Sequence, residues 1–439
     1  MNWGTDNAEL TEVLERGLAA ARRAGASAAK ILCSRDRATS CAFEAGRLKR
    51  TGSETTALYE ITVVKDGRRG VTQCNTTSDI DEMVARAVTL AKVGSIAHFE
   101  QYPAPGTCVA LNRHARSTAS LSRADLTAAG QAMTDVLAAH DAALHIEAEA
   151  DRSETATLLL TSGGVRYSGA RTQWGLGAGA QRTEGTDMLF GWYGRAWGEV
   201  NAHYDPGVIG GRVCEDLRLG SKTVPAPEGK TMLFVPPELM ARVLEPLVMG
   251  VSGKNVAKGD SPLRGRLGEQ VLSPSLTLRD DPHVDYCPDA AAIDNDGVPT
   301  GPCDIVRDGV LTNFLYDLDT AGMAGVEPTG HNGCRPYSPE LRPGSRTHEA
   351  LLAGIEDGIY LRFGIGFGQS NMMNGDVACN VGLGFRIRHG ELVGRVKDTM
   401  IACNVYDVLK SGIELSSDLD PLLRMPYAVL EGVTASTAG

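Results

Sequence analysis

The first half of the chain alternates between helical and strand-like hydrophobic patterns. Apolar side chains recur every three or four positions over residues 8–24, which predicts an amphipathic helix that ends at Gly25. Alternating segments follow, and the Asp66-Gly67 pair predicts a tight turn between the last two. A second helix is predicted from a Ser78 cap to Ala91. The predicted strands are 29–33, 39–43, 58–64 and 69–73.

The same order of elements recurs after a polar, proline-containing loop at 98–120. A predicted helix over 122–139 precedes four strand-like segments, and a helix over 206–217 closes the series. The recurrence lies in element order and not in matching residues, so it indicates an internal duplication within an α+β domain and no particular chemistry. The strands predicted in this second copy are 144–150, 155–160, 172–181 and 187–197.

A segment punctuated by proline and glycine, residues 223–229, is the predicted linker between two domains. Residues 1–222 form the predicted N-terminal domain of helices and antiparallel sheet. Residues 230–439 form the second domain, in which Asp-Gly pairs separate short apolar runs between 282 and 317, a pattern typical of hairpins. The predicted fold is therefore α+β, with two domains and a β-rich C-terminal one.

One apolar stretch within residues 236–271 departs from this β-rich pattern. Its apolar residues recur at helical spacing, which predicts a helix buried on a broad face. They include Leu239, Val243, Leu247 and Val251. Pro246 lies inside this helix, and because it has no N–H and crowds the preceding turn, we expect a kink or a restart near Glu245. A loop with Ser261, Gly265 and Gly268 follows.

Composition limits the classes of function. The chain has 439 residues, and 42% hydrophobic with 22% charged residues is typical of a folded globular protein. A net charge of −11 argues against nucleic-acid binding, which uses basic surfaces. The first residues lack a basic start followed by an apolar run, and no stretch approaches the length of a membrane span. We therefore expect a cytoplasmic protein without nucleic-acid or membrane partners.

Ten cysteines are scattered along the chain without a Cys-x-x-Cys spacing, and a cytoplasmic location disfavours disulfides. Several ligand-type residues in the second half leave a metal site open as an alternative, although their intervals do not match a compact zinc site. They are His283, Cys287, Cys303, His331 and Cys334. A further alternative is a nucleophilic Cys334, but proximity to His331 in sequence does not create the geometry that activates a thiolate.

Short motifs run in a fixed order along the chain. In the second half, Asp294 and Gly297 come first, a Gly-Val-Leu run follows at Gly309, and a Thr-Gly-His-Asn stretch at Thr329 precedes Arg335. Further members are Gly25-Ala26, residues 67–70, Asn374-Gly375-Asp376 and Gly390-Glu391-Leu392. In this order, which covers nearly the whole chain, the motifs resemble those of the TldD/PmbA family. Each motif is short, so their order carries the resemblance.

Active members of that family carry a His-Glu-x-x-x-His zinc motif on a helix, at a fixed distance before a Ser-x-x-x-Gly-x-x-Gly loop. The resemblance places Leu244 and Met249 at the two histidine positions and Glu245 at the glutamate. A zinc peptidase needs imidazole or thiolate ligands for the metal and a carboxylate that activates water. The resemblance thus implies no metal in this chain. We interpret Glu245, the remnant of the motif, as structural rather than catalytic.

No other segment replaces the missing motif. The His348-Glu349 pair has no histidine at the fourth or fifth following position, so we interpret His348 as a solvent-facing or capping residue. The family's cysteine ligand in a Cys-Gly-Lys context is absent around Cys403. The chain is therefore most similar to PmbA, also called TldE, the family's subunit without zinc.

That resemblance implies a catalytically silent subunit with no cofactor of its own. Its partner would be a TldD-like subunit that carries zinc, and the heterodimer would hydrolyse small proteins, peptides or peptide-like amides. The alternative is a stand-alone homodimeric binding or regulatory protein without hydrolase activity.

Overall fold

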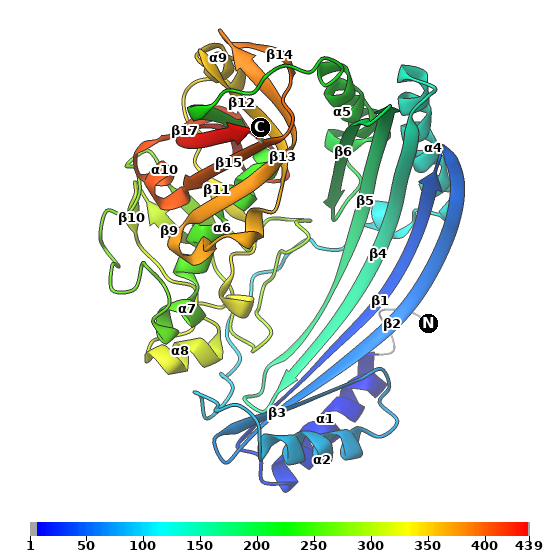
Figure 1. The fold of residues 1–439 in the computed structure, drawn as a ribbon. Helices are drawn as coiled ribbons and strands as arrows, with labels where there is room; N and C mark the ends of the chain where they lie inside the picture. The colour runs from blue at the N-terminus through cyan, green and yellow to red at the C-terminus, as the bar shows by residue number, and fades with distance from the viewer. Residues whose placement is uncertain (1–6, 438–439) are drawn as a thin grey trace.

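The computed structural model describes residues 7–437 and confirms a mixed α+β fold (Figure 1). Residues 1–6, which belong to the segment where we predict no secretory signal, lie outside the described residues. The first half is built on a six-stranded antiparallel sheet in the order β3-β2-β1-β4-β5-β6. Its strands are β1 (Ala28–Glu44), β2 (Arg47–Lys65), β3 (Arg68–Cys74), β4 (His145–Thr161), β5 (Arg166–Glu184) and β6 (Asp187–Trp197).

The central strands are longer than the sequence pattern predicts. Segments 29–33 and 39–43 belong to the single strand β1, and β4 likewise joins two predicted strands. The polar residues between the two segments of β1 continue the ladder because β2 on one side and β4 on the other both pair with them. The predicted turn at Asp66-Gly67 is confirmed, and both residues have positive φ angles, 52° and 70°.

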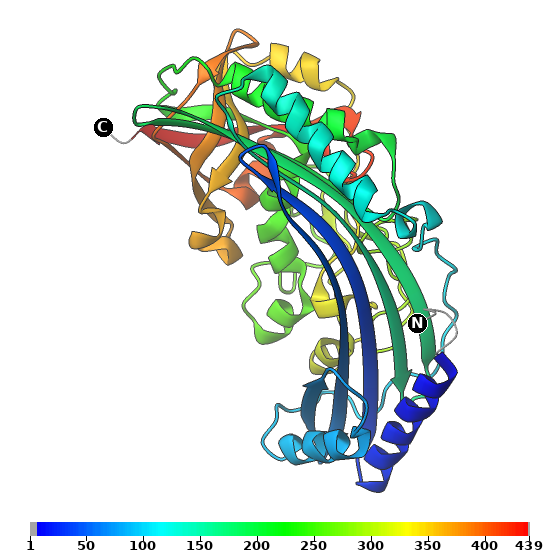
Figure 2. The ribbon, with the colours of Figure 1, turned by 90° about the vertical axis from the view of Figure 1, so that its right-hand side faces the viewer.

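The predicted repetition of element order is present in the fold. A helix, three antiparallel strands and a second helix occur twice, and the two copies meet where β1 pairs with β4. The first helix pair packs at one end of the sheet and the second pair at the other (Figures 1 and 2). The helices of this half are α1 (Asn7–Arg23), α2 (Ile80–Ala91), α3 (Arg116–Ala119), α4 (Arg123–His140), η1 (Ala202–Tyr204) and α5 (Pro206–Leu219).

Local capping explains where these helices begin. Ser122 and Asp125 form a reciprocal capping box at the start of α4, because the Ser122 hydroxyl accepts from the Asp125 N–H and the Asp125 carboxylate accepts from the Ser122 N–H. The predicted Ser78 cap of α2 is wrong by one residue. Asp79 occupies the N-cap position, and the Ser78 hydroxyl donates to the Asp79 carboxylate instead.

Strands of the second half close into a ring. The chain pairs β12 with β7, β7 with β17, β17 with β15, β15 with β13, and β13 back with β12. Strand β14 pairs with β13, and β16 pairs with β17. The strands are β7 (Gly229–Val235), β12 (Asp357–Ile365), β13 (Asp376–Arg388), β14 (Glu391–Arg395), β15 (Thr399–Asn404), β16 (Ile413–Leu419) and β17 (Pro426–Thr437).

A smaller four-stranded sheet and several short helices complete the second half. The small sheet has the order β10-β9-β8-β11, and a predicted Asp-Gly turn at Asp308-Gly309 connects β9 to β10. Its strands are β8 (Leu278–Asp280), β9 (Cys303–Arg307), β10 (Val310–Leu311) and β11 (Pro339–Leu341). The helices are α6 (Pro237–Val251), α7 (Gly253–Lys258), α8 (Leu318–Ala324), η2 (Asn332–Cys334), α9 (His348–Ala353), η3 (Phe367–Gln369), η4 (Met372–Asn374) and α10 (Val405–Ser411).

The two halves are joined by more than a linker. Residues 224–228 form neither helix nor strand, and they separate α5 from β7. One apolar cluster nevertheless contains Leu137 and Val213 from the first half together with Phe234 and Phe385 from the second. In both ribbon views the long strands curve around the second half (Figures 1 and 2). Among residues 7–437, no helix is both long and apolar enough to span a membrane.

Candidate functional site

Helix α6 carries the positions at which the family resemblance places a zinc motif. Leu244 is only 2% exposed and packs in the apolar core of the second half. Met249 is half-buried, and its carbonyl accepts a hydrogen bond from Asn255 at 2.8 Å. These side chains offer neither imidazole nor carboxylate to a metal ion. The sequence of α6 therefore suits packing of the helix rather than metal binding.

The proline inside α6 does not interrupt the helix where we predicted. Helix α6 continues through Pro246 to Val251, and the restart occurs at Ser252, the N-cap of α7. Proline supplies no N–H, so the backbone hydrogen bond to the preceding turn is missing at this position. The Tyr406 hydroxyl donates to the Pro246 carbonyl at 2.8 Å, and the neighbouring apolar residues of the helix belong to the core of the second half.

Glu245 is engaged in a two-point ion pair. The Arg335 guanidinium donates from Nη1 and Nη2 to the two carboxylate oxygens of Glu245, at 2.9 and 2.8 Å. This hydrogen-bonded contact raises the pKa of Arg335 above its usual value. A carboxylate acts as a general base only where it faces an activated water. Both oxygens of Glu245 instead face a cation.

Arg335 also lines a cavity between the two halves. The cavity has a volume of about 490 Å³ and lies between β1, β4 and β5 on one side and residues 289–295 and 332–337 on the other. Three members of the predicted motif series, Asp294, Asn332 and Arg335, thus come together at one site. The other polar side chains of its wall are Ser34, Arg113, Thr155, Thr157, Tyr167, Arg171, Asp289, Asn295 and Tyr337.

Asp294 is the most deeply buried charged residue of this wall, with 1% exposure. Its Oδ1 accepts hydrogen bonds from the backbone N–H groups of Asp296 and Val298, both at 2.8 Å, whereas its Oδ2 is buried without a partner among the described residues. Burial, reinforced by the neighbouring Asp296 carboxylate, raises the pKa of Asp294 to about 7. Asp296 is itself paired with Lys30 at 2.7 Å.

Two arginines of the cavity have little of their hydrogen-bonding capacity used. Arg113 donates from Nη1 to the Tyr167 hydroxyl at 3.3 Å, and its Nε is buried without a partner among the described residues. Arg171 donates from Nη1 to the Pro288 carbonyl at 2.9 Å. Sequence reasoning missed both, because a single arginine in a loop and another in a strand carry no motif that would relate them.

The five residues considered as metal ligands do not converge. His331 is bound from both ring nitrogens, with Nδ1 2.9 Å from the Thr329 hydroxyl and Nε2 3.1 Å from the Asp280 carboxylate. Cys303 lies 4.0 Å from the same Nε2, and His283 contacts the Thr300 hydroxyl at 3.1 Å. Within residues 7–437, these residues form no group of three ligand atoms close enough for one ion.

The thiols of Cys303 and Cys334 are also unsuited to nucleophilic catalysis. Cys334 is fully buried and hydrogen-bonds the Thr320 hydroxyl at 3.1 Å, so His331 does not act on it. Burial raises the pKa of Cys334 above its usual range and that of Cys303 to about 12. A thiolate nucleophile requires the opposite shift.

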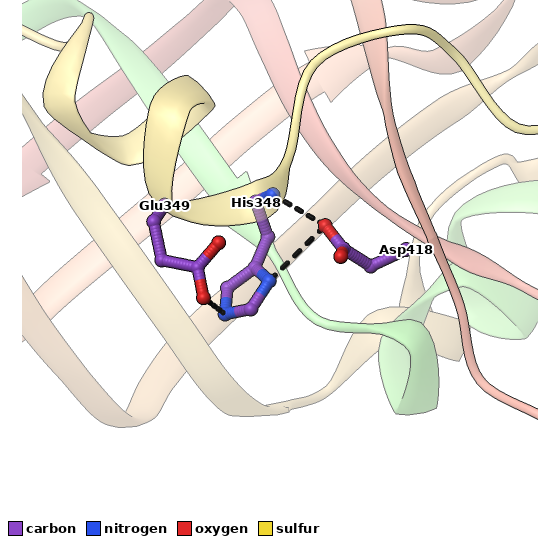
Figure 3. A group of neighbouring side chains, drawn as sticks. All are labelled: His348, Glu349 and Asp418. Carbon is purple, nitrogen blue, oxygen red and sulfur yellow. Dashed lines mark hydrogen bonds and ion pairs between the residues drawn. The ribbon is translucent and has the colours of Figure 1, made fainter.

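Figure 3 shows a second cluster of ligand-type residues, formed by His348, Glu349 and Asp418. The Asp418 carboxylate accepts from the His348 backbone N–H at 2.5 Å and lies 3.1 Å from its Nδ1, and Glu349 lies 3.2 Å from Nε2. His348 is the first residue of α9 and stacks on Tyr427 at 4.5 Å. The predicted capping role of His348 is wrong, because Thr347 is the N-cap of α9 and its side chain accepts from the Ala350 N–H, while Asp418 accepts from the next free N–H of the same helix end.

The fold and its cavity define a two-domain α+β protein with a polar site between a long curved sheet and the loops next to a core helix. Two domain models of one metallopeptidase family match the chain. They are the PmbA/TldA metallopeptidase domain 1, over residues 29–91, and the PmbA/TldA metallopeptidase C-terminal domain, over residues 228–437. Together they cover more than half of the chain, which therefore belongs to the PmbA/TldD family. The membership predicted from motif order is confirmed.

Individual relatives agree with this assignment. A metalloprotease of Methanothermobacter thermautotrophicus is 27% identical over 406 residues, which are 89% of this chain and 88% of that protein. The metalloprotease PmbA of Escherichia coli O157:H7 is 28% identical over 174 residues, 40% of this chain and 38% of that one. The crystal structure of TldE from Thermococcus kodakarensis has the same fold, with a TM-score of 0.87 over 97% of this chain and 100% of that chain at 22% identity.

Proposed function

We propose that this chain is the catalytically silent, TldE-like subunit of a heterodimeric zinc metallopeptidase. The observation that carries the proposal is the state of the zinc-motif positions. Leu244 is buried in an apolar core, Met249 is half-buried, and Glu245 is held by Arg335. Without imidazole ligands these positions do not hold zinc, and a paired carboxylate does not activate water.

The zinc ion and the activated water would come from a TldD-like partner. This chain's contribution would be to complete the substrate cavity, for which the polar space between its two halves is suited. The substrate class is a small protein, a peptide or a peptide-like amide. Relatives named metalloprotease and the fold shared with a TldE structure support this assignment. All ten cysteines are unpaired, which supports a location in the reducing cytoplasm.

Reconstitution tests the proposal. We expect the purified chain to contain no stoichiometric zinc and to cleave no peptide alone, whereas mixing it with a TldD-like subunit from the same organism should yield chelator-sensitive cleavage and a heterodimer by mass measurement. Hydrolysis by the isolated chain at the rate of the mixture would contradict a silent subunit. A stable homodimer that neither binds the zinc subunit nor gains activity would instead support a stand-alone binding or regulatory protein.

A matched pair of variants tests the interpretation of Glu245. Glu245→Gln removes the carboxylate and retains the shape, so cleavage by the mixture should remain within about twofold of the wild-type rate. A loss of about 10²-fold or more, the range found when a general base is removed, would show that Glu245 acts in catalysis. Glu269→Gln, which changes an exposed glutamate paired with Arg266 on the same half, is the control.

A further inference from the structure

The geometry points to a binding site for the C-terminal residue of a peptide in the cavity between the two halves. We propose that Arg113 and Arg171 bind its carboxylate and that Asp294 accepts its backbone N–H. The inference rests on the proposed function, because the ligand class is the peptide substrate. It adds the end of the peptide that this chain recognises and the residues that recognise it.

The two guanidinium groups provide the charge. Each arginine carries five N–H donors in a planar fork that matches a carboxylate. The structure shows one side-chain hydrogen bond for Arg113, to a tyrosine hydroxyl, and one for Arg171, to a backbone carbonyl. No carboxylate of the described residues forms an ion pair with either of them, and the Nε of Arg113 is buried without a partner among these residues. Arg395 and Arg424 also have a buried nitrogen without a partner but are paired with carboxylates, so the missing carboxylate carries the inference.

Arg113 is held in position by backbone contacts from both halves. The Thr172 N–H donates to the Arg113 carbonyl at 2.9 Å, which attaches the loop to β5. The neighbouring Asn112 donates from its backbone and its side chain to the Asp285 carboxylate, at 3.0 and 2.7 Å. These contacts hold the backbone at Arg113 in place, so a ligand need not order this loop when it binds, which favours affinity.

Asp294 supplies the complementary acceptor on the opposite wall. Its Oδ1 is used by two backbone N–H groups, whereas its buried Oδ2 has no donor among the described residues. The last residue of a peptide presents a carboxylate and an N–H within a few ångströms of each other. An inorganic anion offers no such pair, and in an aspartate side chain the carboxylate is one methylene farther from the backbone N–H. The combination of two guanidinium groups and one free acceptor therefore favours a peptide C-terminus.

The other charges near the site do not cancel this preference. Arg335 forms an ion pair with Glu245, and Lys30 Nζ forms one with Asp296 Oδ1 at 2.7 Å. Asp289 is exposed at the rim of the cavity. Arg113 and Arg171 thus remain as the cations without a carboxylate partner on the wall.

Direct binding to the isolated full-length chain tests the proposal. The probes are fluorescein-labelled trialanine with a free carboxylate, the same peptide as its C-terminal amide, and Ala-Asp-Ala as its amide, each measured by fluorescence anisotropy. We expect the free acid to bind at least about tenfold more tightly than either amide, since a two-point charged contact is lost. Equal binding of trialanine and its amide would overturn the proposal. If the Ala-Asp-Ala amide bound as tightly as trialanine with a free carboxylate, the assignment to the peptide C-terminus would be overturned.

Variants identify the residues involved. Arg113→Gln and Arg171→Gln should each abolish the preference for the free acid over the amide. Arg166→Gln is the matched control, because Arg166 lies on the same strand β5 but pairs with Glu15 away from the cavity. A preference that survives both cavity substitutions would contradict the assignment. If circular dichroism shows that Arg171→Gln is unfolded, Arg171→Lys replaces it, with a reduced preference expected.

A chemical change in the ligand tests Asp294. Methylation of the last amide nitrogen should weaken binding to the wild-type chain about fivefold and leave binding to Asp294→Ala unaffected. The same penalty in both proteins would show that Asp294 does not accept that N–H. These measurements need no zinc subunit, so a negative result here leaves the heterodimer proposal intact. A failed reconstitution would in turn leave carboxylate binding measurable.

Discussion

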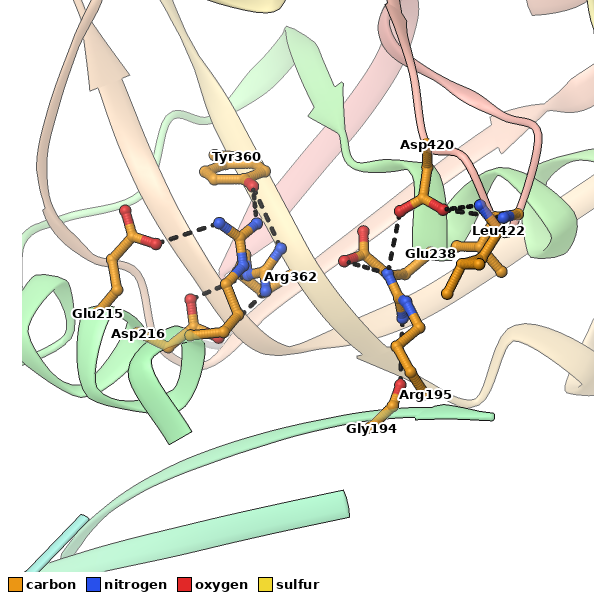
Figure 4. A network of polar contacts seen from close by, with 11 residues as sticks. Gly194, Arg195, Glu215, Asp216, Glu238, Tyr360, Arg362, Asp420 and Leu422 are labelled. Atoms are coloured by element: carbon orange, nitrogen blue, oxygen red, sulfur yellow. Dashed lines mark hydrogen bonds and ion pairs between the residues drawn. The ribbon is translucent and has the colours of Figure 1, made fainter. Parts of the chain in front are cut away.

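Two of the polar regions between the halves of this protein differ in how their arginines are paired. At the junction of α5, α6 and β12, Arg362 forms a two-point pair with Asp216 at 2.9 and 3.3 Å, and Arg195 contacts Glu238 and Asp420 (Figure 4). In the cavity on the inner face of the sheet, Arg113 and Arg171 form hydrogen bonds only with uncharged groups of the described residues.

The difference indicates which region is structural. Buried ion pairs with two-point geometry fix the relative position of two elements, and removing one partner leaves an uncompensated charge. Unpaired polar atoms contribute no such constraint and have a cost when they are buried. Glu238 Oε2 at the junction is also buried without a partner among the described residues, so the regions differ in ion pairing and not in unpaired atoms. The junction therefore stabilises the arrangement of the halves through its ion pairs, whereas the arginines of the cavity can take a carboxylate from a ligand.

The largest expected effect is loss of the junction pair. Arg362→Met should lower the free energy of unfolding by about 3–5 kcal/mol, because it leaves Asp216, 4% exposed, without its cation. Burial already raises the pKa of Asp216, and loss of Arg362 should raise it further. Urea unfolding measures the change. Arg171→Gln in the cavity should cost less than about 1 kcal/mol, and equal effects would remove the distinction between the two regions.

The double variant Arg362→Met with Asp216→Leu sharpens the same test. Replacing a buried ion pair by apolar side chains of similar volume is often close to neutral. The double variant should therefore recover most of the stability lost in Arg362→Met. The single variant Asp216→Leu is measured as well. If the double variant lost as much stability as Arg362→Met and Asp216→Leu lose together, packing rather than charge pairing would explain the losses.

A smaller effect, visible in its pH dependence, is expected for Asp294. Its pKa is about 7 in the folded protein, compared with 3.8 for an ordinary aspartate. Between these values the folded state holds a proton that the unfolded state has released, so this contribution to stability is complete below about pH 4 and is lost as the pH rises through about 7.

The Asp294→Asn variant lacks this titration. Relative to Asp294→Asn, the wild-type chain should lose up to about 1.4 kcal/mol of unfolding free energy per pH unit between pH 5 and 7. Urea unfolding at several pH values measures this difference, and Asp135→Asn on the exposed side of α4 is the control. Parallel stability curves for wild type and Asp294→Asn would show that the buried carboxyl group is ionised throughout.

The smallest effect is expected at the Glu245–Arg335 pair. Arg335 is 56% exposed, so its pairing with Glu245 is screened by water in spite of the favourable geometry. Arg335→Gln should lower the free energy of unfolding by no more than about 1 kcal/mol. Thermal or urea unfolding measures this. A loss comparable to that of Arg362→Met would mean that the cavity wall is as important to stability as the junction.

Much of the fold was predictable because its signals are local. Amphipathic spacing located α1 and α4, and the Asp66-Gly67 turn identified the hairpin of β2 and β3. The long strands were divided in the prediction because their middle residues are polar. Those residues form strand only through pairing with both neighbours, and this is a tertiary effect that no window of sequence contains.

The site was predictable only in part, for a similar reason. Motif order identified Asp294 and Arg335 as members of a series, but nothing in the sequence placed them beside Tyr167 and Arg171 of the first half. The cavity exists because irregular loops of the second half lie on the inner face of the sheet. Long-range packing of this kind determines which arginines remain unpaired. Sequence spacing carried no such information.

The central pairing of β1 with β4 has a consequence for how this protein folds. The hairpins β1–β2 and β4–β5 join residues that are close in sequence, but β1 and β4 pair residues more than a hundred positions apart, such as Lys30 with Thr161. Closing so long a segment has an entropic cost before the contacts form, and it slows folding. We therefore expect refolding in two kinetic stages. Each hairpin forms early with its helices, and the pairing of β1 with β4 then limits the rate.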